Sequence, residues 1–286
     1  FNYLNEAYFY SLLARKFLYA ALFFFLFSAI GVLGIALSKS MGTEGVKYYY
    51  WSVQFFLHFQ LNGWLIFAIL GLLFEWAGRN EILFSEKEES LFFWILFFFF
   101  FFTYALSVSW MDPHWLVYTI NTIGSILSAA AGFLLFRMVA LKQKIFTFKN
   151  SSSAIALTTV AVALIFKLLF ISLCAVPYIA SVSLMIRNFV MGFVHLLTLG
   201  ILSFSLIGFA FEDDILLQSK KNILGVKVLV FAFLTSEIIL LTQGLLLWLG
   251  LGFMPSYHLF IFIASLFIPF GIAILLSDKN NQRRFD

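Results

Sequence analysis

Eight long apolar runs, separated by short polar pieces, make up most of the chain. Each run is close to or longer than the roughly 20 apolar residues that a helix needs to cross a bilayer. Lipid offers the backbone no hydrogen bonds, so continuous runs of this kind form helices. The pattern therefore predicts an all-α, polytopic helical membrane bundle with about eight transmembrane helices. The runs cover approximately residues 16–38, 49–76, 90–110, 115–140, 153–176, 185–211, 224–250 and 257–277.

The composition agrees with a chain that has the bilayer as its solvent. Hydrophobic residues are 63% of the chain and charged residues 11%, and the mean hydropathy is +1.00. Soluble domains carry about 25% charged residues, so a soluble enzyme, a disordered chain and a nucleic-acid binder are excluded. One cysteine, Cys174, excludes a disulfide framework and a four-cysteine metal site. No linker or internal repeat is evident, and we expect one transmembrane domain over residues 1–286.

Lysine and arginine are distributed unevenly among the predicted loops. Lys39, Lys47 and Arg187 fall on one side of the membrane, Lys167 falls inside a span, and the remaining basic residues fall on the other side. Basic loops stay in the cytoplasm, so we expect both termini to be cytoplasmic. The net charge of +4 then reflects topology and not a nucleic-acid surface. The expected location is the bacterial cytoplasmic (inner) membrane.

Two histidines are expected at matching depths in different spans. His58 and His195 lie about nine and ten residues from the outer starts of their spans, or roughly 14–15 Å deep at 1.5 Å per residue. Two neutral imidazoles suit axial ligation of a haem iron, or shared ligation of copper. Asn62 or Thr198 is a candidate acceptor for the second ring nitrogen. Arg187, at the outer end of its span, is a candidate partner for haem propionates.

Other interpretations of the polar residues stay open. Both histidines also fit hydrogen bonds that join helices without any ligand. Lys167 and Glu237 are ionisable groups near the middle of spans, where charges are costly. They are compatible with a mutual ion pair or with part of a proton path.

Several motifs resemble one membrane protein family. Residues 56–64, with the sequence FLHFQLNGW, resemble a helix of the haem-copper-oxidase subunit I-like (cytochrome c oxidase subunit I-like) proteins of Bacteroidota. Residues 187–200 resemble the later histidine-bearing helix of that family, and residues 110–113 and 167–177 fit the same layout. The family pattern includes a His-x-His run and an adjacent histidine pair, which this sequence lacks, so we expect either a chain without the N-terminal helices of the family or a member that has lost those ligands.

The resemblance implies a haem- or copper-associated fold with His58 and His195 as candidate ligands. The leading hypothesis is an oxidase-like protein for electron transfer or for handling oxygen or nitric oxide, with partner membrane subunits or an electron donor. The alternatives are a proton- or solute-translocating transporter and a non-catalytic subunit of a larger membrane complex. Whether the chain is an enzyme stays open.

Overall fold

The computed structural model describes residues 11–82, 84–111, 113–140 and 148–278. Over these residues it contains helices and no strand, which confirms the all-α prediction. Eight helical segments are long and apolar enough to cross a membrane, as the hydrophobic pattern predicts. They cover Leu12–Lys39, Gly45–Arg79, Glu86–Val108, Trp115–Met138, Ser151–Leu173, Arg187–Glu212, Lys220–Trp248 and Tyr257–Leu276.

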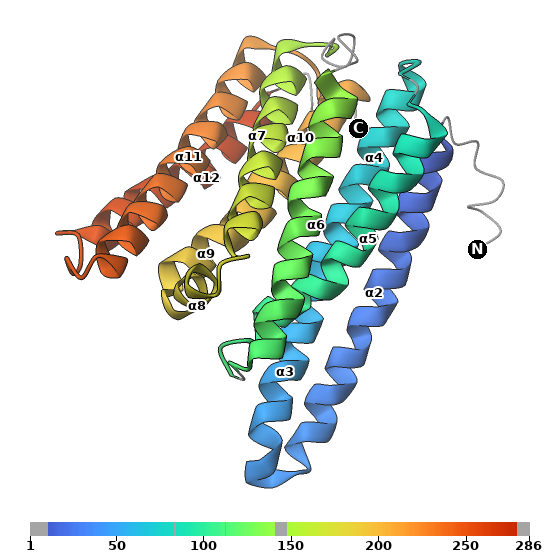
Figure 1. Cartoon of the computed structure of the whole chain (residues 1–286). Helices are drawn as coiled ribbons and strands as arrows, with labels where there is room; N and C mark the ends of the chain where they lie inside the picture. Colours follow the sequence, from blue (N-terminus) through green and yellow to red (C-terminus); the bar gives the residue numbers. More distant parts are fainter. Residues whose placement is uncertain (1–10, 83, 112, 141–147, 279–286) are drawn as a thin grey trace. The chain divides into compact units, whose positions relative to one another are not determined.

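Two of the eight spans are built from more than one helical segment (Figure 1). In the second span, a π-helical stretch over Phe59–Leu65 joins two α-helices, and in the sixth span Leu196–Ser203 does the same. The helices are α2 Leu12–Lys39, α3 Gly45–His58, α4 Ile66–Arg79, α5 Glu86–Val108, α6 Trp115–Ala140, α7 Ser151–Leu173, α8 Pro177–Met185, α9 Arg187–His195, α10 Phe204–Glu212, α11 Lys220–Trp248 and α12 Tyr257–Leu276.

The chain divides into two compact units. Unit 1 comprises Phe1–Ile145 and Leu168–Ser181, and unit 2 comprises Phe146–Lys167 and Val182–Asp286. Most of α7 therefore belongs to unit 2, whereas its last turns belong to unit 1. The expected grouping of all spans into one domain stays a prediction.

In unit 1, α2 packs along α3 and α4, and α6 packs along α5. Phenylalanine rings fill the interior between these helices. Phe24 is fully buried, and its ring lies 5.8 Å from that of Phe59 and 5.1 Å from that of Phe67. Gly63 allows this close packing, because a Cβ atom there would come within 2.7 Å of the Phe24 ring.

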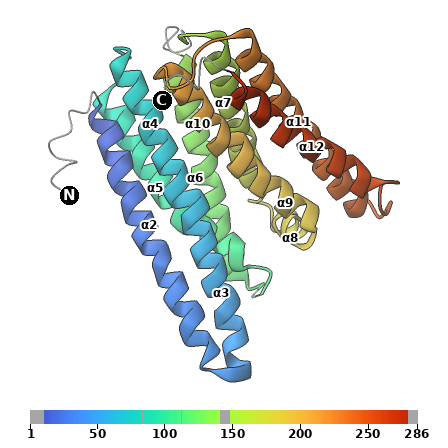
Figure 2. The same cartoon turned by 180° about the vertical axis from the view of Figure 1, so that it is seen from behind.

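In unit 2, α11 runs beside α12, as both views show (Figure 2), and α9 packs on α11. Small residues bring α11 and α12 together. A Cβ atom at Gly225 would lie 2.8 Å from Leu275, and one at Gly271 would lie 2.7 Å from Leu229. Close contact at small residues is the usual basis of helix association in lipid, where the hydrophobic effect does not drive helices together.

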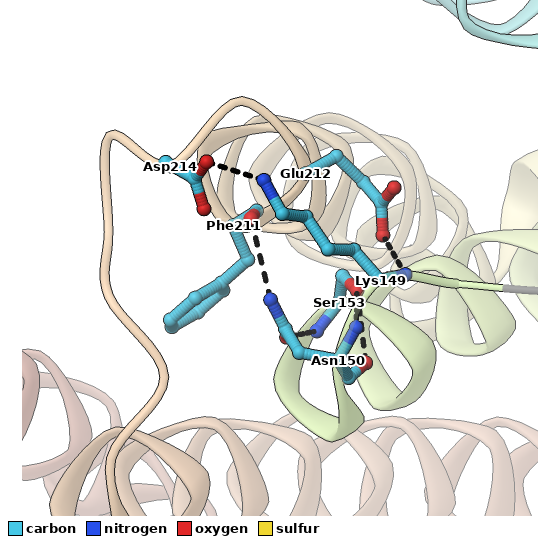
Figure 3. A network of polar contacts seen from close by, with 6 residues as sticks. All are labelled: Lys149, Asn150, Ser153, Phe211, Glu212 and Asp214. Atoms are coloured by element: carbon cyan, nitrogen blue, oxygen red, sulfur yellow. Dashed lines mark hydrogen bonds and ion pairs between the residues drawn. The ribbon is translucent and has the colours of Figure 1, made fainter.

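The start of α7 is fixed by a polar network (Figure 3). The Asn150 side-chain oxygen accepts a hydrogen bond from the Ser153 backbone N–H at 2.9 Å, which caps the helix. The Asn150 amide nitrogen donates to the Phe211 carbonyl at the end of α10. Lys149 pairs with Asp214, and its backbone N–H donates to the Glu212 carboxylate at 3.0 Å. These bonds join the start of the fifth span to the end of the sixth within unit 2.

Candidate functional site

His58 is the last residue of α3 and lies inside unit 1, with 7% of its surface exposed. Its Nε2 atom lies 2.8 Å from the Phe100 carbonyl oxygen, and its Nδ1 atom lies 3.2 Å from the Ser107 hydroxyl. A carbonyl only accepts, so Nε2 carries the proton and donates to it, and Nδ1 accepts from Ser107. Both ring nitrogens therefore join the second span to α5.

Aromatic side chains surround the His58 imidazole. The ring of Phe59 is 5.1 Å away and that of Tyr104 is 5.8 Å away, measured between ring centroids. The Tyr104 hydroxyl donates to the Trp51 carbonyl at 3.1 Å, and the Phe55 ring packs on both Phe59 and Tyr104. His58 is thus held in an enclosed, mostly aromatic environment.

Asn62, one turn beyond His58, is buried within the π-helical stretch. Its side-chain oxygen has no hydrogen-bond partner among the described residues. The acceptor for the His58 ring comes instead from α5, through the Phe100 carbonyl. The predicted role of Asn62 in cofactor binding stays a prediction.

His195 ends α9 in unit 2 and faces a carboxylate on α11. Its Nδ1 atom lies 3.9 Å from Oε1 of Glu237. The His195 side chain is 32% exposed, and Glu237 is buried. Neither facing atom forms a hydrogen bond with any residue that the structure describes. A buried carboxylate next to an imidazole can hold a proton with it, or can orient the imidazole toward a metal.

Gly192 lies one turn before His195 and is a neighbour of Glu237. A Cβ atom at Gly192 would lie 3.5 Å from Glu237 Oε2, which is an ordinary van der Waals distance. The Thr198 hydroxyl donates to the Val194 carbonyl at 2.9 Å, and its predicted role as an acceptor for the His195 ring stays a prediction. Glu237 lies opposite that ring. Arg187, the first residue of α9, is exposed, and its predicted pairing with a propionate is untested.

Lys167 lies in the interior of unit 2 with 1% of its surface exposed. Its Nζ atom is 5.4 Å from the centroid of the Phe193 ring on α9, a cation–π distance. Glu237 faces His195, with 3.9 Å between Oε1 and Nδ1, and its predicted ion pair with Lys167 stays a prediction. A proton path through Lys167 and Glu237 stays a prediction, although both residues occur in the same unit.

The two histidines belong to different units, and their predicted joint ligation of one metal stays a prediction. Over the described part of the chain, no three histidine, cysteine, aspartate or glutamate residues gather as metal ligands. The predicted binding of copper therefore stays a prediction. A haem needs only one or two ligands from the protein, because its macrocycle supplies four.

The sequence pattern did not identify two of the groups that contact His58. Ser107 and the Phe100 carbonyl lie on α5, far from His58 in sequence. Glu237 was predicted as a functional residue, but not as the partner of His195. The only sequence feature that could have pointed to these neighbours was the occurrence of polar or small residues within apolar spans.

Comparison with protein-family models gives no match, and comparisons with curated proteins and with solved structures give none either. The spans therefore define the class of this protein, a polytopic helical membrane protein, and do not narrow it to a family.

Proposed function

We propose that this chain is a haem-associated integral membrane protein that transfers electrons or handles a diatomic gas, with His195 and His58 as the candidate iron ligands. The observation that carries the proposal is the orientation of the two imidazoles. Each has one ring nitrogen next to an oxygen of the following long helix, Glu237 Oε1 for His195 and the Phe100 carbonyl for His58. Metal-ligating histidines almost always have their other nitrogen placed in this way. The second nitrogen of His58 accepts from Ser107, so iron could bind there only in place of that hydrogen bond.

The chemical setting fits haem better than a bare metal ion. A haem needs only one or two ligands from the protein, and a single histidine can be one of them. Arg187 is the candidate partner for a propionate, and Asn62 is a candidate polar contact near His58. When bound, haem supplies one-electron and gas-binding chemistry. The Glu237 carboxylate would hold the proton of His195 Nδ1 and leave Nε2 available as a ligand.

The proposal is tested by the absorption spectrum of the purified protein, produced in cells with ample haem. We expect a Soret band that is lost on His195→Ala. The matched control is His258→Ala, at an exposed histidine near the start of α12. A wild-type protein without pigment and without bound iron would refute the proposal.

A second function is favoured by a different observation, the burial of both Lys167 and Glu237 in unit 2. Ionisable groups inside membrane proteins often mark ion or proton pathways. In that case, cofactor-free protein in liposomes would conduct protons or a solute, and Glu237→Gln would abolish the flux. A protein with neither activity nor pigment, and with stable partner subunits, would instead be a non-catalytic subunit of a larger complex.

A further inference from the structure

Two stretches of the chain share a sequence pattern at a constant offset in residue number. Residues 56–75 and 193–212 are identical at eight of twenty aligned positions, without a gap. Matches of phenylalanine and leucine mean little in this composition, but a histidine, two glycines and a glutamate also match. The identical pairs are Phe56 and Phe193, His58 and His195, Gly63 and Gly200, Leu65 and Leu202, Phe67 and Phe204, Gly71 and Gly208, Phe74 and Phe211, and Glu75 and Glu212.

The matched stretches also have the same local structure. In both, the histidine ends an α-helix and a π-helical segment starts at the next residue, Phe59 in one case and Leu196 in the other. Stretches of π-helix are rare and are often found at functional sites. Because both π-helical segments begin directly after aligned histidines, the two stretches form a structural repeat. An apolar composition alone does not explain this placement.

The preceding helices, α2 and α7, repeat as well. Their caps, Ser11 and Asn150, each accept a hydrogen bond from the N–H three residues later. The aligned glycines also meet equivalent positions. Added Cβ atoms at Gly71 and Gly208 would contact Leu18 and Leu157, and those at Gly63 and Gly200 would contact Phe24 and Ala163. One offset in residue number relates all three pairs on α2 and α7, Ser11 to Asn150, Leu18 to Leu157 and Phe24 to Ala163.

The next helices, α5 and α11, align with each other at the same difference in residue number that separates His58 from His195. His58 contacts the carbonyl of Phe100, and His195 faces Glu237, which aligns with Phe100. Along these helices, several aligned pairs consist of two buried residues. The pairs are Phe92 and Leu229, Leu96 and Phe233, Phe99 and Ser236, Phe100 and Glu237, and Thr103 and Leu240.

The surroundings of the two histidines differ at aligned positions. Phe55, whose ring packs on Phe59 beside His58, aligns with Gly192. Tyr104 aligns with Leu241, and Ser107, which bonds His58 Nδ1, aligns with Gly244. Consequently His58 is enclosed by rings and bonded at both nitrogens, whereas His195 is partly exposed, lies close to a glycine and faces a carboxylate.

We infer that the chain is a duplicated four-span unit, residues 11–140 and 148–278, in which His195 is the ligand-binding copy of a repeated histidine site and His58 is the architectural copy. The ligand class is a flat, metal-bearing molecule of the haem type, which an imidazole backed by a carboxylate favours. This assignment rests on the proposed function for the ligand, but its division of roles between the two histidines does not.

The experiment titrates the purified full-length protein with hemin and measures the Soret absorbance and the melting temperature of each variant. Gly192→Phe copies Phe55 into unit 2, and Gly192→Ala is its control, because a Cβ atom meets only ordinary contacts there. We expect His195→Ala and Gly192→Phe to lose hemin binding and Gly192→Ala to retain it. His58→Ala should retain binding and lower the melting temperature more than His195→Ala does.

The outcomes separate the two proposals. Loss of hemin binding in His58→Ala with an unchanged melting temperature would overturn the division of roles and leave haem binding intact. If wild-type protein does not bind hemin, the ligand assignment fails together with the proposed function. The melting temperatures of the two histidine variants then still decide whether His58 is the architectural copy. A Gly192→Phe protein that is folded and binds hemin normally would contradict the proposed need for a small residue beside His195.

Discussion

The imidazole of His195 and the carboxylate of Glu237 face each other at 3.9 Å within unit 2, and neither facing atom has a hydrogen-bond partner among the described residues. This separation is longer than that of a good hydrogen bond between nitrogen and oxygen. A small side-chain rotation would bring the atoms into contact, so the pair is suited to tightening when a ligand binds to the other ring nitrogen. Buried polar atoms without partners are unfavourable, and a ligand that orders them recovers that energy.

Glu237→Gln tests this coupling directly. The amide oxygen can still accept from His195, but the negative charge is gone, so the imidazole becomes a weaker donor to iron. We expect hemin affinity to fall about 10–100-fold, the range found when partners of ligating residues are altered. The midpoint potential of bound haem should also rise, because a less electron-rich ligand favours the reduced iron. Titration and potentiometry measure the two effects.

Ser236→Ala is the matched control for this variant. Ser236 is the neighbour of Glu237 on α11, and its buried hydroxyl donates to the Phe233 carbonyl of its own helix at 2.8 Å. Affinity and potential should therefore match those of the wild type. If Glu237→Gln also leaves both quantities unchanged, Glu237 has no role in positioning the His195 ring.

The bonds around His58 predict a different result in unit 1. Ser107→Ala removes one hydrogen bond to the imidazole, and we expect a loss of about 0.5–1.5 kcal/mol in the free energy of unfolding. His58→Ala leaves the partners of both nitrogens behind, which should cost about 1–3 kcal/mol. Denaturation in mixed detergent micelles measures both values. Equal stability of His58→Ala and wild type would show that these bonds contribute nothing to the fold.

The spans themselves were predictable from the sequence. Hydrophobic length depends only on neighbouring residues, and all eight runs appear as helices. The two histidines within spans were also recognisable, because a polar residue within an apolar run is conspicuous. Their partners were not, since the Phe100 carbonyl is distant from His58 in sequence and becomes a neighbour only when α5 packs on the second span. Local spacing suggested Asn62 and Thr198, which lie on the same spans as the histidines.

The repeat was hidden for a related reason. The repeated contacts are spread over three helices, and the offset between the copies is slightly larger in α2 and α7 than in the later helices. Aromatic residues of the first copy, such as Phe55 and Tyr104, align with Gly192 and Leu241 in the second. Outside residues 56–75 and 193–212, the aligned helices therefore share few identical residues. Their relationship becomes visible through equivalent caps, glycine contacts and histidine partners.

Two aligned glycines are each in close contact with a phenylalanine ring, Gly63 with Phe24 and Gly200 with Phe233. In Gly63→Ala the new Cβ atom would be 2.7 Å from the Phe24 ring, and in Gly200→Ala it would be 2.6 Å from the Phe233 ring. Contacts this short force rings to move, and overpacking of this kind costs about 1–3 kcal/mol. Thermal melting of both variants should show losses of similar size. Gly132→Ala is the control, with its nearest contact at 3.4 Å; a loss there as large as at Gly63 would indicate a general cost of alanine at helical glycines.

The polar network at the start of α7 separates a helix cap from a surface ion pair. Asn150→Ala removes the cap that accepts from Ser153 and should cost about 1 kcal/mol. Asp214→Asn removes only the ion pair with Lys149. Both side chains of this pair are about half exposed, so its loss should cost less than about 1 kcal/mol. Added salt should weaken the ion pair and leave the cap unaffected, because screening acts on exposed charges. Unfolding measured at low and high salt therefore distinguishes the two contributions, and a salt-dependent effect of Asn150→Ala would contradict the capping role.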